Sequence, residues 1–171
     1  SRLYLTDVQV VEGGKSYYSS RYTANDTLSY GMFMDCRNLR EIALPNTIKV
    51  VEKDAFKGCT GLTVLTIPDE VRSFASLEGC SSLQEFRVSV MNSGFTAEDG
   101  ILYDKGRKTL LLYPEGRVQA VFEIPDGVEK IAECAFQNAL VDTLRMTHSV
   151  VGLGLQAFRG ARLKKVVLSD G

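Results

Sequence analysis

The sequence repeats itself about every twenty-three residues from Phe33 to Leu168, and this periodicity limits the fold more than any other feature. Each unit carries a leucine or a similar residue, a second apolar residue three positions later, and a third two positions after that. A repeat of this length is typical of a solenoid, in which each unit buries its apolar side only against its neighbours. The unit that contains Ile124 is expected to have an interrupted start. The three columns are Leu39, Leu62, Leu83, Val141 and Leu163; Ile42, Leu65, Phe86, Leu144 and Val166; and Leu44, Ile67, Val88, Ile124, Met146 and Leu168.

The first part of each unit predicts a short β-strand. Between positions 64 and 67, Leu65 and Ile67 alternate with more polar neighbours, so one face of the strand is expected to lie in the core. Pro68 follows directly, where a missing N–H and a fixed φ end the strand. Pro45 and Pro125 stand at the same place in their units. Stacked units therefore predict a parallel sheet.

The second part of each unit predicts a turn. A small residue precedes each of Phe56, Phe136 and Phe158. This pair of a small residue and a phenylalanine favours one helical turn on the outer side of the coil, with the phenylalanine ring packed between neighbouring coils. Between Phe74 and Cys80 the element is two residues shorter. The residues of the next column tolerate positive φ, so each coil is expected to leave its turn at this position. They are Asp35, Gly58, Gly79, Asn138 and Gly160.

Three of the four cysteines, Cys36, Cys59 and Cys80, share one column of the repeat. Side chains in one column of a solenoid stack about 4.8 Å apart and nearly parallel, which favours packed free thiols over a disulfide. A disulfide or a metal site is the alternative. With no Cys-x-x-Cys pair and a single histidine, His148, zinc is not expected.

The repeat is interrupted between Val88 and Ile124. Inside this gap, positions 100 to 114 hold two apolar and aromatic segments around a polar turn that contains glycine. This pattern predicts an inserted β-hairpin and a candidate binding protrusion.

The residues from Cys36 to Phe56 carry a family resemblance. Their pattern, Cys-x-x-Leu-x-x-Ile-x-Leu-Pro-x-x-Ile-x-x-Val-x-x-x-Ala-Phe, resembles the BspA-like leucine-rich repeat of bacterial surface proteins. Asp99 to Tyr103 and the later Tyr113-Pro114 are similar to the extended repeat variant of that family. The resemblance implies a secreted or surface-anchored module that binds other proteins, with adhesion reported for some members. It supplies no catalytic residues.

Together these patterns predict a β-rich α/β fold: a right-handed leucine-rich-repeat solenoid with a concave parallel sheet, short helical turns on the convex side and one inserted β-hairpin. We expect one domain over residues 1–171. Residues 1–28 would form a cap-like segment, 29–88 repeats, 89–121 the hairpin insertion, and 122–171 further repeats whose end is uncapped.

The outward strand positions are the first candidates for binding, because solenoids usually bind along the sheet. The outward column mixes both signs of charge and has no aromatic ring, which favours protein contacts over sugar stacking. The alternative is a solvated surface that only maintains solubility. The candidate residues are Glu41, Glu85, Arg87, Glu123, Arg145 and Lys165.

Five of the seven tyrosines lie in the first thirty residues, and Tyr17, Tyr18 and Tyr22 are a candidate aromatic contact patch. The alternative is that this segment closes the exposed end of the solenoid. Apolar residues at positions 3, 5, 8 and 10 would then pair with the first coil.

Composition excludes several functions. The net charge of -1 offers no field for nucleic acid, no apolar run is long enough to cross a bilayer, and any signal peptide or anchor is expected outside these residues. No catalytic, cofactor or metal motif is present, so we expect no enzyme. The leading hypothesis is a non-catalytic extracellular adhesion or protein-binding module whose partner is a protein such as a host surface protein. The alternatives are a structural spacer and a carbohydrate-binding module that uses Tyr103, Tyr113 and the N-terminal tyrosines.

Overall fold

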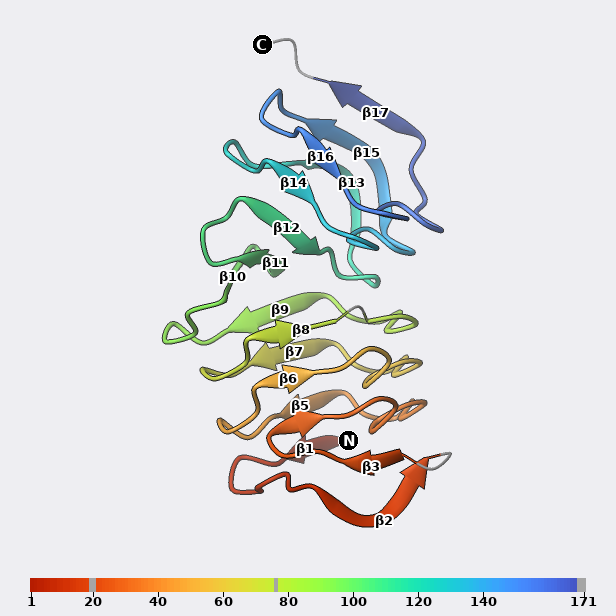
Figure 1. Cartoon of the computed structure of the whole chain (residues 1–171). Coiled ribbons are helices and arrows are strands. Elements are labelled where there is room, and N and C mark those ends of the chain that lie inside the picture. The colour runs from red at the N-terminus through yellow and green to blue at the C-terminus, as the bar shows by residue number, and fades with distance from the viewer. Residues whose placement is uncertain (19–20, 76, 169–171) are drawn as a thin grey trace.

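The computed structural model describes residues 1–18, 21–75 and 77–168, which form one stack of coils with the two chain ends at opposite ends of the stack (Figure 1). Each regular coil contains a longer strand, a short strand and the turns between them. The longer strands form two parallel sheets, in the orders β1-β5-β7-β9 and β13-β15-β17. Their bounds are β1 (Arg2–Tyr4), β5 (Glu41–Ala43), β7 (Val64–Ile67), β9 (Glu85–Val88), β13 (Val118–Glu123), β15 (Leu140–Met146) and β17 (Lys165–Leu168).

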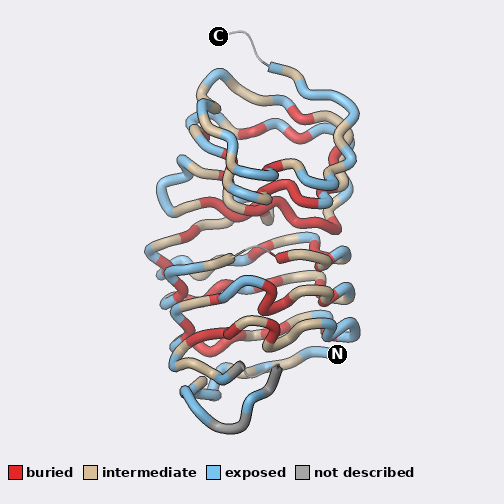
Figure 2. The backbone as a smooth tube through the Cα atoms, turned by 45° about the vertical axis from the view of Figure 1, so that its right-hand side comes forward, coloured by how far each residue is buried: buried red, intermediate tan, exposed pale blue. Residues whose placement is uncertain are grey.

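The short strands form a second wall of the solenoid. One sheet has the order β4-β6-β8 and is parallel, and the other has the order β10-β11-β12-β14-β16. These strands are β4 (Thr27–Leu28), β6 (Val50–Val51), β8 (Ser73–Phe74), β10 (Phe95–Glu98), β11 (Ile101–Asp104), β12 (Thr109–Leu112), β14 (Lys130–Ile131) and β16 (Gly152–Leu153). The buried residues lie between the two walls (Figure 2).

The register confirms the sequence columns. Leu65 pairs with Ile42 on one side and with Phe86 on the other, and all three side chains are buried. Within β7, Leu65 and Ile67 are buried while Thr66 is exposed, as the alternation predicted. The parallel sheet therefore follows from the period of two along each strand, repeated from coil to coil.

The expected helical turns on the convex side are wrong, because none of the described residues forms a helix. The turn at 53–58 has bonds between residues three apart, such as Ala55 N to Glu52 O at 3.2 Å and Lys57 N to Asp54 O at 3.1 Å. Asp54 and Gly58 both have positive φ, at 61° and 72°. An α-helix needs negative φ throughout, so two left-handed residues four positions apart prevent it.

The predicted left-handed column is confirmed. Asp35, Gly58, Gly79, Asn138 and Gly160 all have φ between 55° and 78°. In two cases the neighbouring coil also approaches the glycine: a Cβ on Gly58 would meet Oδ1 of Asp35 and a Cβ on Gly160 would meet Oδ1 of Asn138, so these side chains would have to move. The side chain of one coil thus covers the glycine of the next.

The interruption between Val88 and Ile124 contains a three-stranded antiparallel arrangement. The β10 and β11 strands pair across the Asp99-Gly100 turn, β11 pairs with β12, and β12 then pairs in parallel with β14. The hairpin predicted between positions 100 and 114 is present as β11 and β12. Its second strand also serves as the short strand of a regular coil.

The unit that contains Ile124 has its full beginning, and the interruption lies before Tyr113. Tyr113 occupies the phenylalanine column, and its ring stacks on Phe136 with centroids 5.2 Å apart. Gln119 pairs in register with Val141 and so occupies the leucine column. The Tyr113 hydroxyl donates to Oε1 of Gln119 at 3.1 Å, which satisfies two polar groups in columns that are otherwise apolar.

Strand β11 joins two hydrophobic cores. Leu102 packs in the core of the N-terminal coils, whereas Ile101 and Tyr103 pack in the core of the C-terminal coils. All three side chains are at most 1% exposed. Because successive side chains of a strand point to opposite faces, one strand contributes to both cores.

The N-terminal segment extends the stack. Strand β1 pairs in parallel with β5, and Leu3, Leu5 and Val10 pack against the core, whereas Val8 is exposed. Strands β2 (Gly13–Tyr18) and β3 (Arg21–Thr23) pair antiparallel beyond them. These contacts support the proposal that residues 1–28 cap this end.

A buried carboxylate, Glu115, links the coils across the insertion. In regular coils the N–H of the left-handed residue donates to a carbonyl of the next coil, as Gly58 does to Glu78 at 2.9 Å. The Gly79 N–H instead donates to both carboxylate oxygens of Glu115 at 3.1 Å, and Asn138 Nδ2 donates to Oε1 at 3.2 Å. Burial raises the pKa of Glu115 above its usual range, against the lowering effect of these two donors.

This raised pKa predicts a pH dependence of stability. The folded protein holds the Glu115 proton more tightly than the unfolded chain does, so this group's contribution to the free energy of unfolding falls as pH rises from about 4.3 through the folded pKa. The Glu115→Gln variant should lose that component. Urea unfolding of both proteins at a series of pH values measures it, with Glu133→Gln, at an exposed carboxylate, as control. Parallel curves for the wild type and Glu115→Gln would contradict this role.

Candidate functional site

The outward side chains of the longer strands form a solvent-facing surface in two parts. We call them the first strand face (Glu41, Glu85 and Arg87, on β5 and β9) and the second strand face (Glu123, Arg145 and Lys165, on β13, β15 and β17). The Asp99-Gly100 turn lies between them: the Phe86 N–H donates to Gly100 O at 2.8 Å, and the Arg117 guanidinium donates to Asp99 O. The six predicted residues therefore do not form one continuous site.

Charges on the first strand face are paired with one another. Nε of Arg2 lies 3.1 Å from a carboxylate oxygen of Glu41, and Arg87 forms an ion pair with Glu85 on the same strand. Exposed pairs of this kind contribute about 0–1 kcal/mol to stability. Their main consequence is that the first strand face presents little unsatisfied charge to a partner.

Charges on the second strand face are free. Glu123 and Arg145 are register partners on β13 and β15, and Lys165 lies on β17, yet none of the three forms an ion pair with another described residue. All three are exposed, and so are Val118 and Val121 beside them on β13. This surface combines unpaired charge with exposed apolar groups, which is typical of protein contact surfaces.

The predicted aromatic patch is only partly described. Tyr17 and Tyr18 belong to β2 and Tyr22 to β3 by their backbones, but the side chains of Tyr17 and Tyr18 lie outside the described part of the structure. The Tyr22 side chain is 58% exposed. The patch stays a prediction.

Tyr103 and Tyr113, two of the tyrosines on which the carbohydrate alternative depends, are buried at 1% and 3% exposure. Neither ring can stack on a sugar from solvent. This overturns the role proposed for them.

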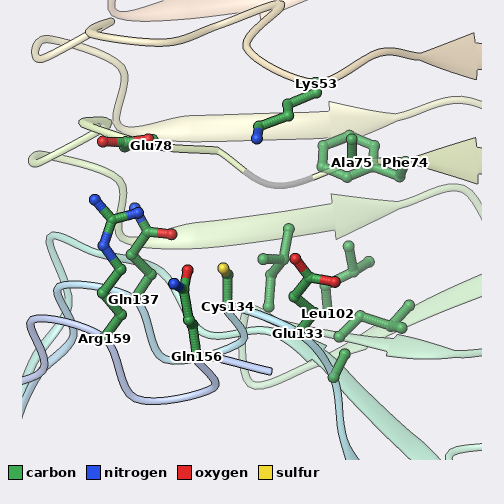
Figure 3. Close-up of a pocket in the computed structure, with 13 residues that line it drawn as sticks. Lys53, Phe74, Ala75, Glu78, Leu102, Glu133, Cys134, Gln137, Gln156 and Arg159 are labelled. Carbon is green, nitrogen blue, oxygen red and sulfur yellow. The ribbon is translucent and has the colours of Figure 1, made fainter. Parts of the chain in front are cut away.

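A recess opens on the turn side of the solenoid, opposite the longer strands, and has a volume of about 370 Å³ (Figure 3). In a regular coil, eight positions separate the last residue of the short strand from the residue in the cysteine column, as between Val51 and Cys59. The next two coils span only six, from Phe74 to Cys80 and from Leu110 to Gly116. Two adjacent short turns leave the recess between full turns on either side. The sequence predicts the short turn after Phe74. It does not predict the one after Leu110, because the repeat is expected to resume later in the sequence.

The cysteine column is free of disulfides, as predicted, but it is buried only in part. All four cysteines are free, with Cys59 and Cys80 buried and Cys36 exposed. The Cys59 thiol donates to Phe33 O at 3.0 Å and the Cys80 thiol to Phe56 O at 3.3 Å. Burial raises the pKa of Cys59 to about 11 and that of Cys80 further still.

The described residues give little support for a metal site or a membrane-spanning helix. They contain no group of three His, Cys, Asp or Glu side chains arranged to hold a metal ion, and His148 is exposed at a turn. No helix in the described part of the chain is long and apolar enough to cross a membrane.

Comparison with known families identifies the class of protein. The BspA type leucine rich repeat region matches in six copies, over residues 23–97 and 118–171. These residues make up most of the sequence, so the chain belongs to the BspA-type leucine-rich repeat family, as the repeat pattern indicated. No curated protein matches the sequence.

Three solved structures share the fold. A leucine rich cell surface protein from Faecalibacterium prausnitzii is 26% identical with a TM-score of 0.73, over 99% of this chain and 41% of that one. The pneumococcal vaccine antigen PcpA is 22% identical with a TM-score of 0.73, over 81% and 36%. A leucine-rich repeat protein from Eubacterium ventriosum is 16% identical with a TM-score of 0.51, over 77% and 48%. The chain thus spans less than half the length of each.

The burial of the cysteine column predicts unequal thiol reactivity. Because the thiolate is the reactive form, Cys59 and Cys80 should react with a disulfide reagent at pH 8 only as fast as the protein unfolds locally, whereas Cys36 should react at once. Mass spectrometry of the labelled native protein over time measures the three rates, with labelling in denaturant as the reference. Rapid labelling of Cys59 in the folded protein would show that the column is open.

Proposed function

We propose that the chain is a non-catalytic extracellular module of a bacterial surface protein and that it binds other proteins, with adhesion as the outcome. Membership of the BspA-type family supports a protein-binding role, and the similar Faecalibacterium protein is described as a cell surface protein. A secreted or surface-anchored location is part of the proposal. The expected partner is a protein exposed outside the cell, such as a host surface protein.

The single observation that favours a binding surface is the difference between the two strand faces. Both lie on parallel sheets of similar construction, but the charges of the first face neutralise each other while those of the second do not. Unpaired exposed charge steers association and selects partners by complementarity. We therefore assign the partner contact to the second strand face, with Glu123, Arg145 and Lys165 at its centre.

The two alternatives have less support. A spacer needs no unpaired charge next to exposed valines on one sheet only, and the second strand face has both. Carbohydrate capture has lost the two tyrosines at positions 103 and 113, which are buried.

Charge reversal tests the assignment. The triple variant Glu123→Lys, Arg145→Glu, Lys165→Glu should weaken binding to the protein partner by at least about tenfold. Its thermal unfolding should stay close to that of the wild type, since exposed substitutions usually change stability by about 0.5 kcal/mol or less. Biolayer interferometry against a panel of purified extracellular-matrix and host surface proteins gives the affinities.

The matched control reverses the first strand face: Glu41→Lys, Glu85→Lys, Arg87→Glu. It changes the same number of charges on the neighbouring sheet and should leave binding within about twofold of the wild type. The two triple variants shift the net charge in opposite directions, so equal loss in both would show that the contact is not specific to the second strand face. No binding to any protein on the panel, or full binding by the first triple variant, would contradict the proposed function.

A further inference from the structure

The recess on the turn side has an apolar floor that comes from three coils. Phe74 ends β8 and Ala75 follows it, Leu102 lies on β11, and Leu111 and Leu112 lie on β12. Leu102 and Leu112 are buried in the N-terminal core, so the floor is held rigidly from beneath. An apolar floor of this kind suits an aliphatic side chain.

An amide without a hydrogen-bond partner lines the same recess. Gln137 is only 7% exposed, and its side chain forms no hydrogen bond with any described residue. Its amide atoms are not fully enclosed, since among the described residues only Ser29 Oγ and Asp54 Oδ1 are enclosed side-chain polar atoms without a partner, so a ligand in the recess can reach them. The carboxamide offers both a donor and an acceptor, which matches the two polar atoms of a peptide bond.

Charges of opposite sign stand on the two sides of this amide. In Figure 3, Arg159 lies on one side of the recess and Glu133 on the other. Both are exposed, and neither forms an ion pair with a residue that the structure describes. The nearby Glu78 differs, because Lys57 Nζ holds its carboxylate at 3.4 Å. Lys53, which also lines the recess, is likewise exposed and has no ion pair with a described residue, so the recess presents two free cations and one free anion.

We propose that this recess binds a short apolar peptide with free ends. The terminal carboxylate pairs with Arg159, the terminal ammonium with Glu133, a peptide bond with Gln137, and an aliphatic side chain rests on the Leu102 floor. The volume of about 370 Å³ is near the lower end for ligand pockets and suits roughly two or three residues. The site lies away from both strand faces, so it does not depend on the function proposed above.

The assignment of each peptide end is tested by a cycle of blocked peptides and protein variants. The tripeptide Ala-Leu-Ala is titrated into the 171-residue chain, with binding followed by amide chemical shifts in NMR spectra. Amidation of its carboxyl end should weaken binding to the wild type by about tenfold, and to Arg159→Gln by less than about twofold. Acetylation of its amino end should show the same pattern with Glu133→Gln.

Two further variants complete the design. Arg162→Gln removes an exposed arginine that is paired with Asp142 outside the recess, and it should preserve the full preference for the free carboxyl end. Gln137→Leu should weaken all the peptides alike. If its buried position prevents folding, the Arg159 and Glu133 variants decide the question, because both side chains are exposed.

Three results would overturn the proposal. One is the absence of shifts around Gln137 at about 10 mM peptide, a concentration that detects even millimolar affinity. Another is equal affinity for peptides with free and blocked ends, which would indicate an internal segment of a partner protein as the occupant. The third is an undiminished preference for the free carboxyl end in Arg159→Gln.

Discussion

Burial by the neighbouring coil is the interaction on which the rest of the structure depends. Leu144 and Val166 are register partners in one column, yet Leu144 is fully buried while Val166, in the last described coil, is 48% exposed. Ile131 and Leu153 differ in the same way, at 1% and 59%. Residues at equivalent positions of the repeat thus differ in burial, because some are covered by a neighbouring coil and others are not.

The insertion preserves this stacking and gives rise to the two strand faces and the recess. Strand β11 contributes to both cores, and Tyr113 and Gln119 continue two columns with a hydrogen-bonded pair of polar residues. Two consequences follow. The Asp99-Gly100 turn divides the outward strand surface into two faces, and the two short turns open the recess. The departures from the repeat therefore account for both of the proposed binding surfaces.

The sequence predicts the strands and turns that recur in every coil. It does not predict features that depend on how neighbouring coils pack. Strand alternation around Leu65 and the left-handed turn at Gly58 follow from local chemistry, and both are confirmed. The predicted helical turn is wrong because a second left-handed residue, Asp54, stands in the turn and is not a glycine that would mark it in the sequence. Cys36 is exposed although its column suggests burial, since burial depends on the coil around it. The recess escaped prediction because its floor and walls come from separate coils, and the pairing of charges on the first strand face depends on side-chain positions.

Because stacking continues through the insertion, we expect all the coils to form one cooperative unit. Native-state hydrogen exchange at increasing urea concentration tests it directly, with the amides of Leu65 in β7 and Leu144 in β15 as probes on either side. The account predicts that both amides exchange through the same global unfolding, with equal free energies and equal dependence on urea. Exchange of one amide by a separate unfolding step, at lower free energy than the other, would show that the insertion divides the solenoid into two independent parts.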